Sequence, residues 1–430
     1  MSQQYILDRQ QMPPTQLPES LTLPSHTLYT TDNGVELYAL SSGDNPVIRL
    51  SVVFRSGSRH QIHPFTASAT LNMLSEGTAR LTSAEISQTL DFYGIFYDTS
   101  IDRDFSIVTI NVLEKFLPEA LDLLEQLLIY PSFSEKELDI YKSKRSEQLK
   151  VEREKPAYLA RELFSKTLFG ENHPYGLISD VSSYETLTTS HIKDYFATHF
   201  TAQNSFAVCS GKLSDESISS IKELLSKLPL QSKPKIDNPV PPVKNSPRAH
   251  IEREDALQTS IRIGLPLFTK GDPRYEQMQV VAMVLGGYFG SRLVRNLREE
   301  HGYTYGIYAA MVSMQHVGYF AIATDVTAQY TGDAIEQIFY EIERLHTELI
   351  SHEELTVVKN MIVGEVMRII DGPFGIADVV IDNIESSMDP AYLDQFLQTV
   401  REITPQTIKE LATEHLRREN LTLVTIGSEK

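Results

Sequence analysis

Hydrophobic and polar positions follow two different spacings along the chain, and the two spacings alternate in blocks. Residues 47–55, VIRLSVVFR, are hydrophobic at most positions and predict a buried strand. Two further strand-like runs follow at residues 95–100 and 105–113. From Pro118 to about Phe169 the hydrophobic spacing becomes that of amphipathic helices. We therefore predict an α+β fold with mostly antiparallel sheets and helices packed on one face.

Capping signals predict where several helices begin. The segment FTASATLNMLSEGT has the composition of a short buried helix, which we expect Thr66 to cap and Gly77 to end. Thr82 and Glu85 form a capping-box pattern at the start of the next helix. A long helix is expected to begin at Ser134, again with a glutamate three residues later.

Two proline-rich stretches predict the domain boundaries. Residues 1–25 contain four prolines and predict an extended N-terminal arm. Residues 232–247, SKPKIDNPVPPVKNSP, contain five prolines and few large hydrophobic side chains, which is typical of a linker. The chain is thereby divided into two domains of similar size, residues 26–231 and 248–430.

An internal repeat indicates that the two domains are homologous. Residues 187–211 align without gaps to residues 403–427, with identical amino acids at seven of 25 positions. Unrelated segments of this length would share roughly one or two residues. Upstream positions correspond at nearly the same offset, among them Pro156 and Pro373. We interpret the chain as two copies of one α+β unit.

Composition excludes several classes of protein. The chain has 430 residues and a formal charge of −18, which argues against a nucleic-acid partner and favours peptides with basic segments. Cys209 is the only cysteine, so no disulfide framework is possible, and its hydrophobic surroundings predict a buried thiol. Because no secretory signal or membrane-spanning run is recognisable, we expect a soluble cytoplasmic protein without a membrane partner.

Three residues of the first predicted helix have the spacing of a metal site without its chemistry. Ser68, Leu71 and Asn72 lie at i, i+3 and i+4, and so share one helix face. This is the spacing of the inverted zinc motif H-x-x-E-H. Ser and Asn offer only neutral oxygens, and Leu cannot accept a proton from a metal-bound water.

The residues around this helix resemble those of the pitrilysin, insulin-degrading enzyme and mitochondrial processing peptidase family. Gly57-Ser58-Arg59 and Gly77-Thr78 match residues that flank the zinc motif in that family. Residues 289–309, FGSRLVRNLREEHGYTYGIYA, look like its substrate-binding segment. The hallmark of that segment is an arginine followed seven residues later by a tyrosine, here Arg298 and Tyr305.

The same resemblance implies that the zinc site is absent. Active members of the family bind zinc through the two histidines of the motif and a glutamate about 76 residues further on, a position held here by Gln148. All four matching positions, Ser68, Leu71, Asn72 and Gln148, therefore lack the family's residue. We expect no catalytic residue, no metal and no cofactor in this chain.

Other potential metal ligands are interpreted as structural. His60 and His63 form an H-x-x-H pattern in a loop and are expected to face solvent, since no carboxylate lies nearby in the sequence. His346 and His352 are expected on different faces of one helix. Glu365 occupies the repeat position of Gln148, but no zinc motif accompanies it.

The resemblance implies a non-catalytic, substrate-binding subunit of a heterodimeric zinc peptidase. Its partner would be a homologous chain with an intact zinc motif, and its substrates unfolded peptides, to which Arg298 and Tyr305 would bind. An alternative is a scaffold or peptide-binding homodimer with no proteolytic role. A third hypothesis, a hydrolase with Ser68 as nucleophile, lacks a nearby base in the sequence. Without the resemblance, Arg298 would be interpreted as a surface charge.

Overall fold

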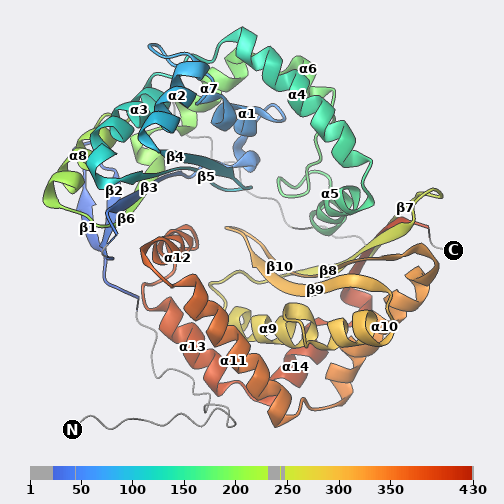
Figure 1. Ribbon diagram of the computed structural model, residues 1–430. Coiled ribbons are helices and arrows are strands. Elements are labelled where there is room, and N and C mark those ends of the chain that lie inside the picture. Colours follow the sequence, from blue (N-terminus) through green and yellow to red (C-terminus); the bar gives the residue numbers. More distant parts are fainter. Residues whose placement is uncertain (1–22, 44, 231–242, 244–246, 429–430) are drawn as a thin grey trace, which may run out of the picture.

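The structure, a computed structural model, describes residues 23–43, 45–230, 243 and 247–428. The predicted arm and linker lie almost wholly outside these residues. Figure 1 shows two halves that face each other, each with a sheet on its inner side and helices on its outer side. The expected α+β fold is confirmed.

The first half is built on one sheet with a buried centre. Its strands are β1 (Thr27–Thr30), β2 (Glu36–Ser41), β3 (Val47–Phe54), β4 (Phe96–Ile101), β5 (Ser106–Leu113) and β6 (Ser205–Gly211). The order is β1-β2-β6-β3-β5-β4, and only β2 and β6 run parallel. The central strand β6 is buried at every position, whereas β4 lies at an edge and alternates between exposed and partly buried positions.

The helices of the first half differ in how they begin, because side chains cap only some of them. They are α1 (Thr66–Met73), α2 (Ser83–Tyr93), α3 (Leu117–Ile129), α4 (Glu135–Arg153), α5 (Pro156–Phe169), α6 (Ser183–Thr186), α7 (Thr189–His199) and α8 (Asp215–Ser226). The predicted capping box of Thr82 and Glu85 is present at α2. Ser134 caps α4 by accepting from the backbone N–H of Glu137.

The predicted ends of α1 are wrong. Thr66 is the first helical residue, and the N-cap is Phe65, whose φ of 64° is left-handed. The Phe65 ring stacks on Tyr184 with 4.0 Å between ring centroids, so a distant aromatic contact accompanies this turn in place of a side-chain cap. The helix ends at Met73, before Gly77.

The second half repeats this plan. Its strands are β7 (Arg248–Glu252), β8 (Gln258–Leu267), β9 (Thr304–Ser313), β10 (Gly318–Thr327) and β11 (Thr422–Gly427). The order is β7-β11-β8-β10-β9, and only β11 and β7 run parallel. The helices are α9 (Arg274–Ala282), α10 (Thr331–Thr347), α11 (His352–Ile369), α12 (Pro373–Glu385), α13 (Tyr392–Glu402) and α14 (Pro405–His415), with π-helical turns η4 (Met283–Gly287) and η5 (Val294–Glu300).

The internal repeat corresponds to equivalent structure. Helix α7 and strand β6 of the first half match α14 and β11 of the second. Gly211 and Gly427 end the two strands with φ of 118° and 139°, a region that favours glycine. A Cβ at Gly211 would approach the carbonyl oxygen of Val47 to 2.1 Å, so no larger residue fits there.

Each half also places one helix on the inner face of the other half's sheet (Figure 1). Helix α5 packs on β8 and β11, where Phe164 and Leu168 are buried in one cluster with Val424. Helix α12 packs on β6 and β2, where Val380 and Ile381 share a cluster with other buried residues of both halves. The repeat-equivalent residues Pro156 and Pro373 begin these two helices. The halves are therefore joined by a reciprocal exchange of helices.

A buried carboxylate also links the halves. Asp104 is 3% exposed and accepts from Arg59 Nε at 2.5 Å and from the hydroxyl of Tyr175 at 2.8 Å. It also accepts from the backbone N–H of Gln315, in the turn between β9 and β10, at 3.2 Å. Arg59 completes the link by donating to Gln315 Oε1 at 2.9 Å.

Candidate functional site

The three motif positions on α1 are already used within the helix or the core. The Ser68 hydroxyl donates to the carbonyl oxygen of Phe65 at 3.1 Å. The Asn72 amide donates to the carbonyl oxygen of Ser68 at 2.8 Å. Leu71 is 1% exposed and belongs to the hydrophobic core of the first half. None of these side chains offers a lone pair suited to zinc.

The fourth position, Gln148 on α4, is exposed and bonded to its own helix. It accepts from Arg145 at 2.8 Å and donates to Glu152 at 3.0 Å. The Arg145 guanidinium lies beside Tyr141, and α1 packs against α4 so that Tyr141 also lies beside Ser68. Burial raises the pKa of the Tyr141 phenol, while Ser68 and Arg145 lower it. A fixed positive charge therefore stands next to the motif helix, where it would repel a divalent cation.

The donor set does not fit zinc, nor do histidines elsewhere rebuild a site. In the part of the chain that the structure describes, no group of three or more His, Cys, Asp or Glu side chains could bind a metal. His60 and His63 are half-buried, so the expectation that they face solvent is wrong. His60 Nδ1 accepts from the backbone N–H of Gly57 at 3.0 Å, and His63 Nε2 pairs with the Thr186 hydroxyl at 2.9 Å.

The remaining candidate ligands are also separated. His346 lies near the end of α10 and His352 at the start of α11, so the expectation of one shared helix is wrong. The break occurs because Ser351 caps α11 and thereby starts a new helix. Glu365 is exposed on α11 and pairs with Arg368.

The predicted substrate-binding segment lies against β9, the edge strand of the second sheet. Both π-helical turns, η4 and η5, pack on this strand. A Cβ at Gly286 would come within 2.6 Å of the backbone nitrogen of Ala309, so only glycine allows this close approach. Residues of the turns are thereby brought next to residues of β9.

Arg298 and Tyr305 present their polar groups to solvent. Arg298 of η5 is exposed, with its Cζ 4.9 Å from the centroid of the Phe289 ring. Within the described ranges its guanidinium makes no hydrogen bond or ion pair. Tyr305 is 90% exposed at a β-bulge of β9, and Tyr308 on the same strand is 58% exposed. The segment thus combines free donors with exposed aromatic surface at an edge strand, while the substrate-binding role of Arg298 and Tyr305 remains a prediction.

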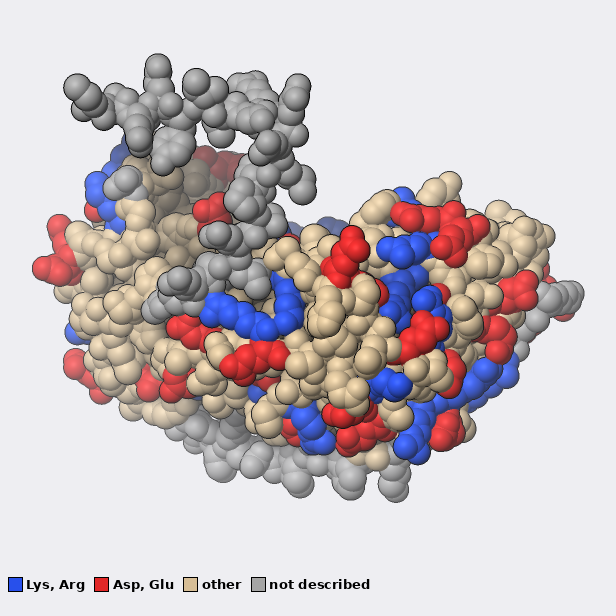
Figure 2. All heavy atoms as spheres, turned by 90° about the horizontal axis from the view of Figure 1, so that it is seen from below, with Lys and Arg blue, Asp and Glu red and all other residues tan. Residues whose placement is uncertain are grey.

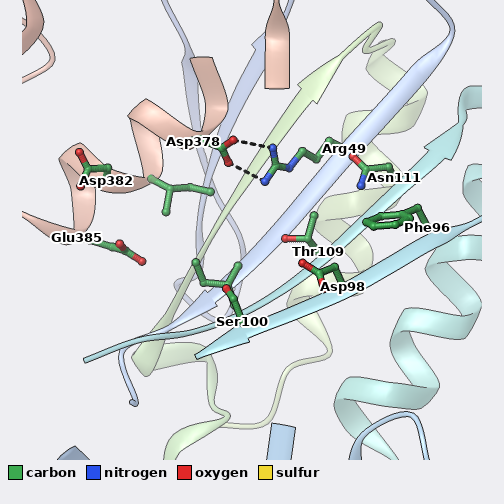
Figure 3. Close-up of a pocket in the computed structure, with 11 residues that line it drawn as sticks. Arg49, Phe96, Asp98, Ser100, Thr109, Asn111, Asp378, Asp382 and Glu385 are labelled. Carbon is green, nitrogen blue, oxygen red and sulfur yellow. Dashed lines mark hydrogen bonds and ion pairs between the residues drawn. The ribbon is translucent and has the colours of Figure 1, made fainter. Parts of the chain in front are cut away.

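An acidic pocket that sequence reasoning missed lies between the halves. It has a volume of about 420 Å³ and opens between α12 and the inner face of the first sheet (Figure 3). Its lining includes Phe96 and Asp98 of β4, and Asp378, Asp382 and Glu385 of α12. No local signal could have found this pocket, because its two walls are separated by more than half the chain.

The carboxylates of this pocket differ in their partners. Asp378 pairs with Arg49 at 2.7 Å, and Asp382 pairs with Lys270. Burial, with Asp102 and Asp382 nearby, raises the pKa of Glu385 to about 8. By contrast, acidic and basic side chains are interspersed on the face shown in Figure 2. The pocket is therefore an acidic site that this outer surface does not repeat.

Comparisons with known proteins identify relatives over most of the chain. Residues 38–179 match the family described as Insulinase (Peptidase family M16), and residues 186–362 match the Peptidase M16 inactive domain. An uncharacterised zinc protease of Bacillus subtilis is 23% identical over 403 residues, which is 91% of this chain and 93% of that protein. A non-peptidase homologue of Helicobacter pylori is 26% identical over 241 residues, 55% of each chain.

A solved structure shows the same fold. The crystal structure of a peptidase M16 inactive domain from Pseudomonas fluorescens has a TM-score of 0.86 and 24% identity, and the match covers 94% of this chain and 98% of that one. The described part of the chain also contains no helix with the length and hydrophobicity needed to cross a bilayer.

Proposed function

Because the chain belongs to the insulinase family of peptidases and carries a degenerate zinc motif, we propose that it is the non-catalytic, substrate-binding subunit of a two-chain zinc peptidase. The supporting observation is the chemistry at the four motif positions, where Ser68, Leu71, Asn72 and Gln148 offer no imidazole or carboxylate. The relatives' names point both ways, since one is called a zinc protease and another a non-peptidase homologue. The residues of this chain favour the second description.

The partner would be a homologous chain that carries the intact zinc motif. Zinc and its activated water would then belong to the partner, and this chain would contribute contacts to the peptide. Arg298 would offer forked N–H donors to the carbonyl oxygens of an extended substrate. Tyr305 would place a hydroxyl near the bond to be cleaved. The exposure of both side chains on or beside the edge strand β9 supports this role.

The acidic pocket supports peptides with basic side chains as substrates. Asp98 lines it together with the ring of Phe96, which is 63% exposed. A lysine or arginine side chain would meet the Asp98 carboxylate and an aromatic face there. The net charge of −18 would further favour basic segments over acidic ones.

The test compares the chain alone with the two-chain complex. We expect the purified chain to contain no stoichiometric zinc and to leave a quenched peptide uncleaved, and the complex to cleave it in a chelator-sensitive manner. Within the complex, Arg298→Ala should lower kcat/KM about ten- to a hundredfold, the range of hydrogen bonds from a charged donor. Arg295→Ala is the matched control, because Arg295 is also exposed on η5.

Two results would contradict this proposal. Chelator-sensitive cleavage by the chain alone would show that it carries its own metal site. Equal rates for the Arg298 and Arg295 variants would return Arg298 to an ordinary surface charge.

A scaffold or peptide-binding homodimer with no proteolytic role is the second candidate. It is supported by the same four motif positions, whose side chains do not suit a metal, and by the name of the Helicobacter pylori relative. Co-purification from the native cell separates the two candidates: a homodimer without a zinc-bearing partner favours the scaffold. The Ser68 nucleophile is not proposed, because its hydroxyl donates to a backbone carbonyl and lies beside Tyr141 rather than a base. The cytoplasmic location stays a prediction, which cell fractionation would test.

A further inference from the structure

The aromatic ring under Arg298 has no role in the function proposed so far. Phe289 is 65% exposed and lies between the two π-helical turns, where the Arg298 guanidinium carbon sits over its ring at 4.9 Å. Both side chains belong to the segment that Gly286 holds against β9. Phe289 and Arg298 therefore belong to one segment that packs against β9.

Some of the other arginines that lie over rings are also paired with carboxylates. Arg274 lies over Phe268 and also donates to Asp272 at 2.7 and 2.9 Å. Arg418 lies over Phe339 and also pairs with Glu336. Arg298 has no such carboxylate among the residues described. The contact with the Phe289 ring therefore restricts the orientation of the Arg298 guanidinium.

A ring contact fixes an arginine without occupying it. The face of a phenyl ring attracts a cation but is a poor hydrogen-bond acceptor, so the guanidinium keeps its N–H donors for another ligand. A carboxylate partner would instead consume those donors and neutralise the charge. An arginine that is already ordered also loses less rotamer entropy when it binds.

We propose that Phe289 is a positioning residue, which holds Arg298 in the orientation that binds peptide carbonyl groups. This inference rests on the proposed substrate-binding role of Arg298. It assigns Phe289 no direct contact with the peptide. The effect of Phe289 on binding must therefore depend on the presence of Arg298.

A double-mutant cycle on the full chain tests this dependence. The probe is a fluorescein-labelled, lysine-rich unstructured peptide, and its affinity is measured by fluorescence anisotropy. Phe289→Ala should weaken binding about two- to fivefold, the range of an exposed cation–π interaction. Phe289→Tyr should restore binding, because it keeps the ring face. In the Arg298→Ala background, Phe289→Ala should have no further effect.

A spectroscopic signal reports the same contact without any ligand. In a ¹⁵N–¹H spectrum, the Arg298 Nε–H resonance should be shifted by the ring current of Phe289. The shift should disappear in Phe289→Ala and persist in Phe289→Tyr. Phe92→Ala is the control, because Phe92 is 81% exposed on α2 in the other half and should change neither signal.

The possible failures can be told apart. If Phe289→Ala weakens binding equally in both backgrounds, the ring contacts the peptide itself and the positioning role is wrong. If Arg298→Ala weakens binding and Phe289→Ala does not, only the positioning role is wrong. If Arg298→Ala leaves peptide binding unchanged, the substrate-binding role of this segment is wrong as well.

Discussion

Polar side chains behave in opposite ways in two regions of the molecule. One region is the former zinc positions on α1 and α4, and the other is the segment beside β9. Ser68, Asn72 and Gln148 direct their hydrogen bonds to their own helices. Arg298 and Tyr305 leave theirs open to solvent, and the Arg298 guanidinium lies over the Phe289 ring. The difference shows that a match to a functional motif position says little until the hydrogen bonds of that position are known.

The two exchanged helices show a similar contrast. Helix α5 contributes Phe164, Leu168 and Phe169 to a hydrophobic contact with the second half. Helix α12 buries hydrophobic residues on one side and presents acidic residues to a pocket on another. Both exchanged helices line polar pockets, but α12 contributes three acidic side chains to its pocket, whereas α5 contributes only Pro156 and Ala157.

Returning the catalytic glutamate to the motif should have the largest effect on stability. Leu71 is 1% exposed, so Leu71→Glu would bury a carboxylate without a partner. We expect a loss on the order of 3–5 kcal/mol in the free energy of unfolding, measured by urea denaturation. Leu71→Met is the control and should cost less than about 1.5 kcal/mol. Unchanged stability of Leu71→Glu would mean that this position can reach solvent and that the site is not closed.

The acidic side of α12 should make stability depend on pH. The pKa of Glu385 is about 8 in the folded chain, above its ordinary value of 4.5, so the folded state retains a proton that the unfolded state releases. The contribution of Glu385 should therefore fall as the pH rises from about 4.5 to about 8, by at most about 1.4 kcal/mol per pH unit.

Glu385→Gln should remove this contribution while keeping the shape of the side chain. The measurement is the free energy of unfolding of both proteins at the two ends of that pH range. The difference between them should change with pH in the stated direction. A difference independent of pH would mean that Glu385 is ionised in the folded chain.

Removal of one hydroxyl from the open segment should have a smaller effect, on turnover alone. In the two-chain complex, Tyr305→Phe should lower kcat/KM about two- to tenfold, the range of one neutral hydrogen bond. The fold should be unaffected because Tyr305 is 90% exposed. Tyr308→Phe, on the same strand, is the matched control. Equal effects of both changes would remove any special role of Tyr305.

The polar residues of the closed site should matter least. The combined change of Ser68, Asn72 and Gln148 to alanine removes bonds that lie within helices or at the surface. Stability should change by about 0.5 kcal/mol or less per site. Peptide hydrolysis by the complex should stay at the wild-type rate. A strong loss of hydrolysis would show that this face still contacts the substrate.

Local signals made much of the fold predictable from the sequence. The strand β3 and the cap at Thr82 depend on residues within one segment, and both were predicted. The N-cap of α1 was not, because it coincides with the stacking of Phe65 on Tyr184, far away in the sequence. Tertiary contacts of this kind override local propensity.

The candidate site was predictable only in part. The quoted segment contains both Phe289 and Arg298, so their contact had a visible signal: an aromatic residue near an arginine between two turns. The acidic pocket had none, since β4 and α12 meet only through the exchange of helices. The missed features are therefore those that depend on how the two halves assemble.

The reciprocal placement of α5 and α12 has a consequence for how the chain tolerates cleavage. If a protease cleaved the chain between residues 231 and 247, we would expect the two fragments to stay bound to each other. Each fragment would keep a helix that packs on the sheet of the other fragment. Expressed alone, either fragment would expose the inner face of its sheet and the helix that normally packs on the other half. We would therefore expect it to aggregate. We therefore expect the two halves to be stable together and neither half to be stable alone.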